Sequence, residues 1–190
     1  MIKNLIRIAI IFLLTSCSMP ETKVYNLNVQ VDKGTVVQRG DASIVILIDA
    51  QRYLTQPYIA YRSSPYQMNI SRYSKWESSP KMMVKSALKD SLISTGLFKD
   101  VKTLNIVPEG FYVLDINLKR FERLDEGSES FGELDFDFSF MSPEGKELSR
   151  DRITKKVDLE DQSFLSLAKS LSNALEEAIK EVRTSIVNAF

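Results

Sequence analysis

Few side chains in this sequence have the types and spacing that catalysis or metal binding needs. The 190 residues include no histidine, which removes the commonest general base and the commonest metal ligand. Cys17 is the only cysteine, so the chain can form no intrachain disulfide, CxxC redox pair or cysteine metal site. The sequence also lacks GxSxG, GxxxxGK, GxGxxG and HExxH motifs. Hydrolase, P-loop ATPase, dinucleotide-enzyme and zinc-protease interpretations therefore have no motif to support them.

An acidic segment between positions 125 and 137 is the best candidate for metal binding or for a hydrolytic carboxylate pair. Its spacing does not match an EF-hand loop. Asp135 and Asp137 alternate with three phenylalanines, as on the solvent side of a strand. We therefore expect no metal site and no catalytic residues here. The segment comprises Asp125, Glu126, Glu129, Glu133, Asp135 and Asp137.

The most distinctive local feature is an aromatic cluster between positions 53 and 76. Tyrosine and tryptophan join an apolar body to a polar tip, so a surface that contacts lipid or a partner protein is one interpretation. Packing in an edge strand and under a helix is the other, and it is favoured for Trp76, which precedes a predicted helix. The cluster contains Tyr53, Tyr58, Tyr61, Tyr66, Tyr73 and Trp76, and the candidate contact residues are Tyr58, Tyr61, Arg62, Tyr66 and Trp76.

The first sixteen residues have the layout of a secretory signal. Lys3 and Arg7 give a positive start, and residues 8–14 are an apolar run too short to span a bilayer. The following sequence Leu-Thr-Ser-Cys, at positions 14–17, resembles a bacterial lipobox, in which the cysteine becomes the lipidated first residue. We therefore predict cleavage after residue 16 and lipidation of Cys17. A bystander thiol in an ordinary leader is the weaker alternative.

The residues after the predicted cleavage site indicate in which membrane the protein is anchored and how far the domain can lie from it. Ser18 stands where an aspartate would favour the inner membrane, so the rule for such lipoproteins favours the periplasmic face of the outer membrane. Residues 18–24 form a tether of seven residues, which spans at most about 25 Å. The full chain carries 25 basic and 25 acidic residues, so nucleic-acid binding is not expected.

Periodic patterns over residues 25–190 predict one α+β domain. Alternating or continuous apolar patterns favour strands, and two stretches with a 3.6-residue period favour helices, the first opened by Ser79-Pro80 and stopped by Gly96. We expect a mainly antiparallel sheet with two amphipathic helices packed on one face, the last of which covers this domain's own core. The expected strands are 25–31, 44–48, 58–62, 67–73, 101–106, 111–121, 131–141 and 146–157, and the helices run from 80 to 95 and from 163 to the end.

Residues 58–101 resemble the ABC-type transport auxiliary lipoprotein family of the paraquat-inducible protein C type. The resemblance rests on YIAYRSSPY at 58–66, on Tyr73 and Trp76, and on STGLFKDV at 94–101. The lipobox, the Tyr-Asn-Leu opening at 25–27 and the closing amphipathic helix extend it over nearly the whole mature chain. An acidic insert near residues 125–133 departs from the family pattern.

The resemblance implies a non-enzymatic subunit without a cofactor. It would serve an ABC-linked system whose periplasmic partner is a mammalian-cell-entry-type protein, moving phospholipid or other hydrophobic molecules between the membranes. In that role the aromatic surface would meet the end of a lipid conduit, and a homo-oligomer would match a multimeric conduit. Two alternatives stay open: a lipid carrier with its own apolar cavity, and an envelope hydrolase that uses the acidic cluster.

Overall fold

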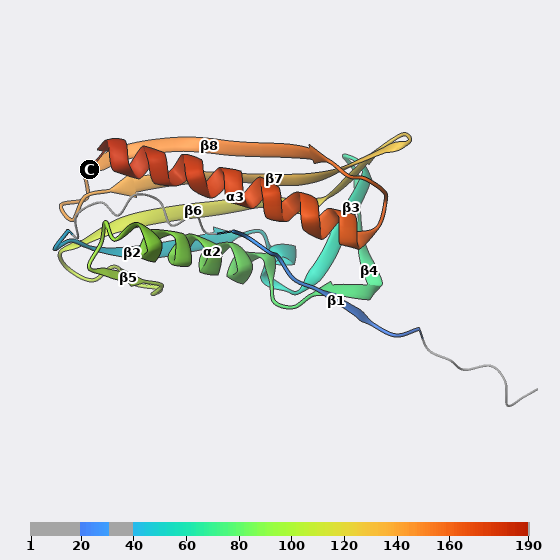
Figure 1. Ribbon diagram of the computed structural model, residues 1–190, viewed down its shortest axis with the longest axis horizontal. Coiled ribbons are helices and arrows are strands. Elements are labelled where there is room, and N and C mark those ends of the chain that lie inside the picture. The colour runs from blue at the N-terminus through green and yellow to red at the C-terminus, as the bar shows by residue number, and fades with distance from the viewer. Residues whose placement is uncertain (1–19, 31–39, 190) are drawn as a thin grey trace, which may run out of the picture.

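The computed structural model describes residues 20–30 and 40–189, which form one curved sheet and two long helices (Figure 1). The predicted leader and Cys17 lie outside the described residues. None of the described helices is long and apolar enough to cross a membrane. The strands are β1 (Lys23–Tyr25), β2 (Ser43–Ala50), β3 (Tyr58–Ser64), β4 (Gln67–Trp76), β5 (Asp100–Lys102), β6 (Phe111–Glu126), β7 (Glu129–Met141) and β8 (Glu147–Asp158), and the helices are η1 (Arg52–Thr55), α2 (Pro80–Thr95) and α3 (Phe164–Ala189).

The sheet is organised around the long strand β6. One edge of β6 pairs antiparallel with β7, which in turn pairs antiparallel with β8. The other edge is shared: residues 111–118 pair with β2, and residues 123–124 pair with β3, both in parallel. Beyond these, β5 pairs in parallel with β2, β4 pairs antiparallel with β3, and β1 pairs in parallel with β4. The sheet is therefore mixed but mostly antiparallel, which confirms the predicted α+β class.

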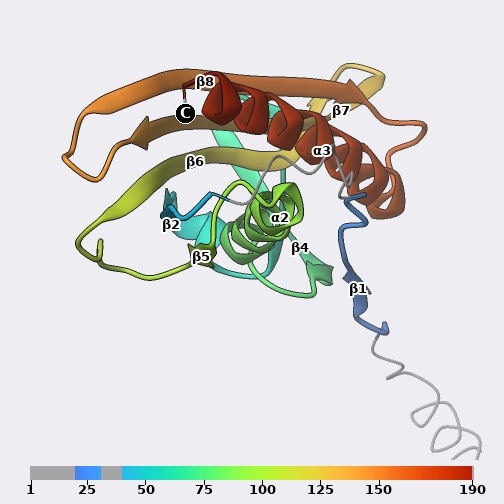
Figure 2. The same ribbon diagram turned by 60° about the vertical axis from the view of Figure 1, so that its left-hand side comes forward.

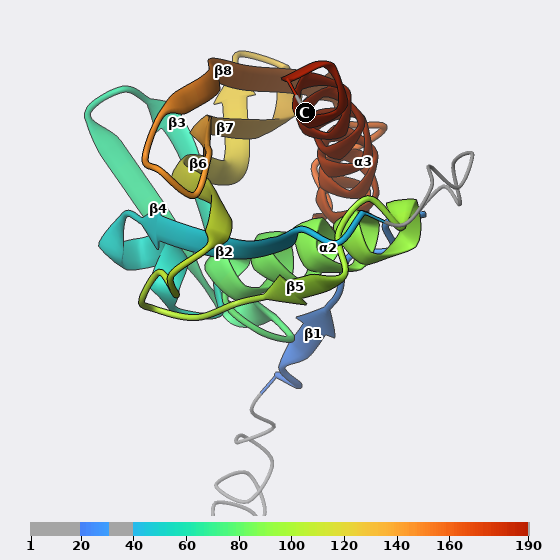
Figure 3. The ribbon, with the colours of Figure 1, turned by 90° about the vertical axis from the view of Figure 1, so that its left-hand side faces the viewer.

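Both long helices lie on the inner face of the curved sheet, as predicted. Seen along the long axis, the strands form an arc from β8 to β5 and the helices lie on its open side (Figure 3). Helix α3 packs against β7 and β8, α2 packs against β2 and β5, and the two helices contact each other. The turned view in Figure 2 shows α3 running along β7 and β8.

The signals at the ends of α2 act as the sequence predicted. The Ser79 side chain accepts a hydrogen bond from the Met82 backbone N–H at 3.3 Å, and Pro80 occupies the first turn. Gly96 ends the helix with a φ of 64°, a left-handed conformation that glycine adopts without strain. Between these ends, Val84 and Leu88 are buried against the sheet.

The apolar stripe of α3 covers the core of its own domain. Its buried side chains face Phe136, Phe138 and Phe140, which alternate along β7 toward the inner face. Gly132 allows the close approach of helix and strand, because a Cβ there would lie 3.3 Å from the Ser170 Cβ atom. The buried apolar residues of α3 are Leu167, Ala168, Leu171, Ala174, Leu175, Ala178, Ile179, Val182 and Ile186.

Two predicted strands are much shorter in the structure. Only Lys23–Tyr25 forms β1, because the next residues leave the sheet and pack against α3, where the Asn28 N–H donates to the Ser172 Oγ at 3.0 Å. Strand β5 ends at Lys102, since β5 and β6 both run parallel to β2 and the chain must turn back before β6 begins. Residues 103–110 therefore form a loop, and the short helix η1 was not predicted.

The two ends of the long axis carry different parts of the chain (Figure 1). Strand β1, the β3–β4 hairpin and the β6–β7 turn lie at one end, which we call the β1 end. Strand β5, the β7–β8 turn and the last turn of α3 lie at the other, which we call the β5 end. Pro20, the first described residue, precedes β1, so a lipid at Cys17 would join the chain three residues before the described part of the β1 end.

Replacing Ser79 by alanine should lower the free energy of unfolding by about 1 kcal/mol, because the first turn of α2 loses its side-chain cap. Urea denaturation of the mature chain measures the change. The matched control is Ser78→Ala, one residue outside the cap position, which should change the free energy by less than about 0.5 kcal/mol. Equal losses in the two variants would contradict the assigned cap.

Candidate functional site

The structure separates the predicted contact residues Tyr61 and Arg62. Neighbouring side chains in a strand point to opposite faces, and here Tyr61 faces inward while Arg62 faces outward. The Tyr61 ring lies 6.2 Å from the Phe164 ring and 5.0 Å from the Arg123 guanidinium carbon. The Arg123 guanidinium also lies 5.2 Å from the Phe164 ring and forms a salt bridge with Asp125 at 2.9 Å. Tyr61 therefore helps to hold the start of α3 against β6.

Arg62 belongs to a buried polar cluster on the outer side of the sheet. Its Nε donates to the Glu122 carboxylate at 2.5 Å, and the Tyr53 hydroxyl donates to the same carboxylate at 2.8 Å. The Glu122 side chain is fully buried, so these two donors compensate a charge that has lost its water. Burial, followed by the nearby Glu122 charge, raises the pKa of Tyr53. Arg62 is thus committed to holding β3 on β6.

Trp76 lies in the core. Its side chain has no exposed surface, and its ring meets the Phe121 ring edge-on at 5.5 Å between centroids. The indole Nε1 has no hydrogen-bond partner among the described residues. This is the placement that the sequence analysis favoured for Trp76, and it removes this side chain from the surface.

Tyr58 and Tyr66 remain exposed, at 44% and 96% of their surface. Val24 of β1 and Ile70 and Tyr73 of β4 are also exposed. We call these five residues the aromatic face. They belong to β1, β3, β4 and the β3–β4 turn, all at the β1 end. A groove of about 560 Å³ adjoins them and is lined by Gln51, Arg52, Tyr53, Gln56, Tyr58 and Met68.

Three carboxylates of the acidic segment pair with basic side chains on adjacent strands. Glu133 pairs with Arg120 at 2.7 Å, Asp137 pairs with Lys119 at 2.5 Å, and Asp135 pairs with Arg152 at 2.7 Å. Within residues 20–30 and 40–189, no three acidic, histidine or cysteine side chains are grouped so as to hold a metal ion. Asp135 differs from the prediction because it is buried, at 3% exposure, rather than solvated.

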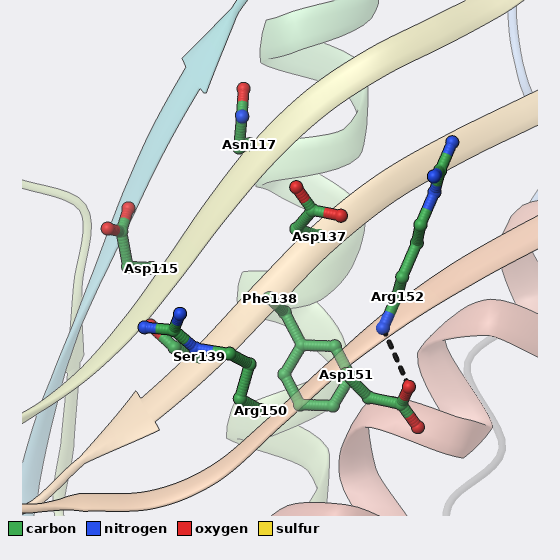
Figure 4. A pocket seen from close by; sticks show the side chains of 8 residues that line it. All are labelled: Asp115, Asn117, Asp137, Phe138, Ser139, Arg150, Asp151 and Arg152. Carbon is green, nitrogen blue, oxygen red and sulfur yellow. Dashed lines mark hydrogen bonds between the residues drawn. The ribbon is translucent and has the colours of Figure 1, made fainter.

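The outer face of β6, β7 and β8 carries a shallow depression of about 470 Å³ (Figure 4). Carboxylates and guanidinium groups both line it, and the dashed line in Figure 4 marks the backbone N–H of Arg152 donating to the Asp151 carboxylate at 2.7 Å. Charges of both signs stand side by side, so the depression has no single charge preference. Its lining residues are Asp115, Asn117, Asp137, Phe138, Ser139, Arg150, Asp151 and Arg152.

Sequence reasoning did not identify Glu122, Arg123 or Phe164 as organising residues. Glu122 and Arg123 interrupt the alternation of β6 between Phe121 and Leu124, and this break in the pattern was the available signal. Their partners come from β3, from η1 and from the start of α3, which are distant in sequence. Periodicity alone does not supply such long-range pairs.

These features define an α+β domain. Its buried ionisable side chains, such as Glu122 and Asp135, pair with other residues of the domain, and some of its aromatic residues, such as Tyr58 and Tyr66, are exposed. The chain belongs to the ABC-type transport auxiliary lipoprotein component family, whose match covers residues 25–183. This confirms the expected ABC-type transport auxiliary lipoprotein family, while the resemblance to the paraquat-inducible protein C type stays a prediction. A search of curated proteins found no match.

Solved structures share the fold at low sequence identity. Protein XCC0632 of Xanthomonas campestris, from family DUF330, is 16% identical with a TM-score of 0.76, over 87% of this chain and 96% of that one. An uncharacterized protein is 12% identical with a TM-score of 0.68, over 87% and 99% of the two chains. A PelC dodecamer of Paraburkholderia phytofirmans reaches a TM-score of 0.45 at 14% identity, over 80% and 93%, which is too low to support any argument about assembly.

Trp76→Ala should lower the free energy of unfolding by about 3–5 kcal/mol, because it leaves a cavity beside Phe121. Tyr66→Ala is the matched control from the same predicted set, and at 96% exposure it should change the free energy by less than about 0.5 kcal/mol. Urea denaturation of both variants measures the difference. Comparable losses would contradict the separate placements of these two aromatic residues.

The buried Asp135 should make stability depend on pH. Burial alone would raise the pKa of Asp135, but the hydrogen bonds and charge of Arg152, with smaller contributions from Thr154 and Lys119, hold that pKa below its usual value. Since the folded-state pKa is the lower one, this contribution to stability is present above the unfolded value near 4 and is lost as the pH falls through the folded value.

Asp135→Asn should therefore flatten the decrease in the free energy of unfolding between about pH 5 and pH 2. Urea denaturation at a series of pH values measures the slope. Asp151→Asn removes an equal charge from an exposed residue of β8 and is the control. Parallel curves for the wild type and Asp135→Asn would contradict the role of the Asp135–Arg152 pair.

Proposed function

We propose that the chain is a lipid-anchored, non-enzymatic docking subunit of an ABC-linked system of the mammalian-cell-entry type. That system would move phospholipid or other hydrophobic molecules between the inner and outer membranes. The observation that carries the proposal is the family match over residues 25–183, which makes the chain an auxiliary lipoprotein component of ABC-type transport. The periplasmic partner is then the mammalian-cell-entry-type protein.

The start of the domain supports close attachment to a membrane. Strand β1 begins at Lys23, so five residues, 18–22, separate it from Cys17 instead of the seven predicted. Fully extended, five residues span roughly 18 Å. With Cys17 lipidated, the β1 end lies at the bilayer surface. Ser18 favours the outer membrane and its periplasmic face.

The packing favours docking over the other two hypotheses. The space between the sheet and the helices is filled by fully buried side chains such as Phe136, Phe140 and Leu171, which supports a solid core rather than a carrier cavity. Glu133, Asp135 and Asp137 each form a salt bridge with a basic side chain of the fold. A hydrolytic pair instead needs one carboxyl group whose pKa is raised.

Purification of the lipidated protein from mild detergent should recover a mammalian-cell-entry-type subunit, with the protein found in outer-membrane fractions. Cys17→Ser should release the protein from membranes, because the acyl chains are lost. Ser18→Asp is the matched control: it keeps the lipid but should move the protein to the inner membrane. Both variants should abolish transport that depends on outer-membrane docking, although the domain stays folded.

Intact-mass measurement of the natural protein checks the anchor directly. Attached acyl chains at Cys17 together with recovery of the partner support the proposal. A lipidated protein that never recovers such a subunit, or normal lipid transport in the Ser18→Asp strain, would contradict the docking role. An unmodified thiol at Cys17 would contradict the proposed attachment to the outer membrane.

A further inference from the structure

The aromatic face lies on the outer side of β1, β3 and β4 and on the turn between β3 and β4. Tyr73 and Lys75 alternate with the inward-facing Trp76, so they share the outer face. In the sheet, Lys75 is paired with Tyr58 on one side and with Val24 on the other. Tyr58, Val24 and Lys75 therefore stand side by side, and the hairpin turn carries Tyr66 beyond them.

Two basic side chains of β4 border this surface. Arg72 and Lys75 are exposed, and neither has a salt bridge within the part of the chain that the structure describes. Lys23 is exposed too, but it pairs with Ser74 and so points to the opposite side of β1 from Val24. One acidic residue, Glu77, is exposed nearby, so the local charge is only mildly positive. A surface of tyrosines with a modest excess of basic groups has the composition that suits the headgroup region of a bilayer.

The position of the chain start favours a bilayer over a protein as the occupant. Val24 belongs both to this surface and to β1, the strand that residues 18–22 connect to Cys17. A segment of at most roughly 18 Å keeps this surface beside the lipid anchor. The exposed apolar loop residues Leu104, Ile106 and Val107 lie beyond β5, at the opposite end of the long axis.

We propose that the aromatic face rests on the surface of the anchoring bilayer, with its tyrosines at headgroup depth and Arg72 and Lys75 against anionic phospholipid headgroups. This inference rests on the anchor of the proposed function and assigns the aromatic face to lipid rather than to the conduit. The lipid anchor and the aromatic face then fix two points of the domain, which sets its orientation as well as its location. The β5 end faces away from the bilayer.

A label at single introduced cysteines tests the orientation. Cys17 is the only native cysteine, so in the lipidated protein an introduced thiol is the only free one. Tyr73→Cys and Ile106→Cys are each labelled with an environment-sensitive fluorophore in the full lipidated chain. The protein is then reconstituted into vesicles of phosphatidylethanolamine and phosphatidylglycerol that contain lipids with a headgroup-level quencher.

The label at position 73 should be quenched by these lipids, and the label at position 106 should stay accessible to a water-soluble quencher. Equal exposure of both labels to water would overturn the proposal. Lipid quenching at position 106 alone would overturn it as well. Shielding of position 73 only when the mammalian-cell-entry-type partner is added would assign the face to that partner. Shielding only at high protein concentration in detergent would assign it to a second copy of the chain. Either result would also overturn the proposal.

Charge reversal tests the headgroup contact. Lys75→Glu should weaken the lipid quenching at position 73 in vesicles with phosphatidylglycerol, since one basic residue changes affinity for an anionic surface by about fivefold. Lys99→Glu is the matched control, because Lys99 is exposed at the β5 end. Equal effects of the two variants would contradict the contact.

Failure of this inference is distinguishable from failure of the proposed function. If position 73 stays in water while the acylated protein still recovers its partner, only the orientation is wrong. If Cys17 carries no lipid, the proposed function itself is wrong, because it requires a lipid-anchored subunit.

Discussion

The fold depends on one strand, β6, serving two different partners along the same edge. Pairing with β2 ends at Leu118, and pairing with β3 begins at Arg123. The register between β6 and β7 shifts between Leu118 and Arg120, at this same change of partner. Such a bulge bends the strand and shifts its alternation, so the inward series passes from Leu118 to Phe121. The backbone N–H of Gln51, just before η1, donates to the Leu118 carbonyl at 3.4 Å and bridges the gap.

The two charged residues after this bulge, Glu122 and Arg123, hold neighbouring elements on β6. Glu122 holds Arg62 of β3 and Tyr53 of η1, while Arg123 lies between Tyr61 and Phe164 on the other face. Removing one partner of a buried charge costs about 3–5 kcal/mol, so these groups constrain each other strongly. The short contact between β3 and β6 is thus reinforced from both faces, and the β3–β4 hairpin is rigidly attached to the core that it extends.

The sequence predicted the parts of this fold that local patterns encode. Helix α2 was bounded correctly because Ser79, Pro80 and Gly96 act through neighbouring backbone groups, and β7 followed from its alternating phenylalanines. The full length of β6 was not predicted, because its charged second half is buried by residues from three other elements. The same limit applies to the candidate site. Alternation alone shows that Tyr61 and Arg62 point to opposite faces of β3. Only the tertiary structure shows that Tyr61 packs on Phe164 and Arg62 binds Glu122, whereas Tyr58 and Tyr66 are exposed.

The length of α3 indicates how far the domain extends from the β1 end. Helix α3 begins beside Tyr25 and Tyr61 at the β1 end and runs the length of the sheet, and its 26 residues span about 39 Å. With the proposed lipid at Cys17, the five residues before β1 would be shorter than the domain itself, so the domain would have little freedom to move away from the membrane. A conduit that crosses the periplasm would then have to approach within roughly 40 Å of the bilayer to reach the β5 end. In the proposed orientation, the loop of residues 103–110, with Ile106 at 74% exposure, would face such a conduit.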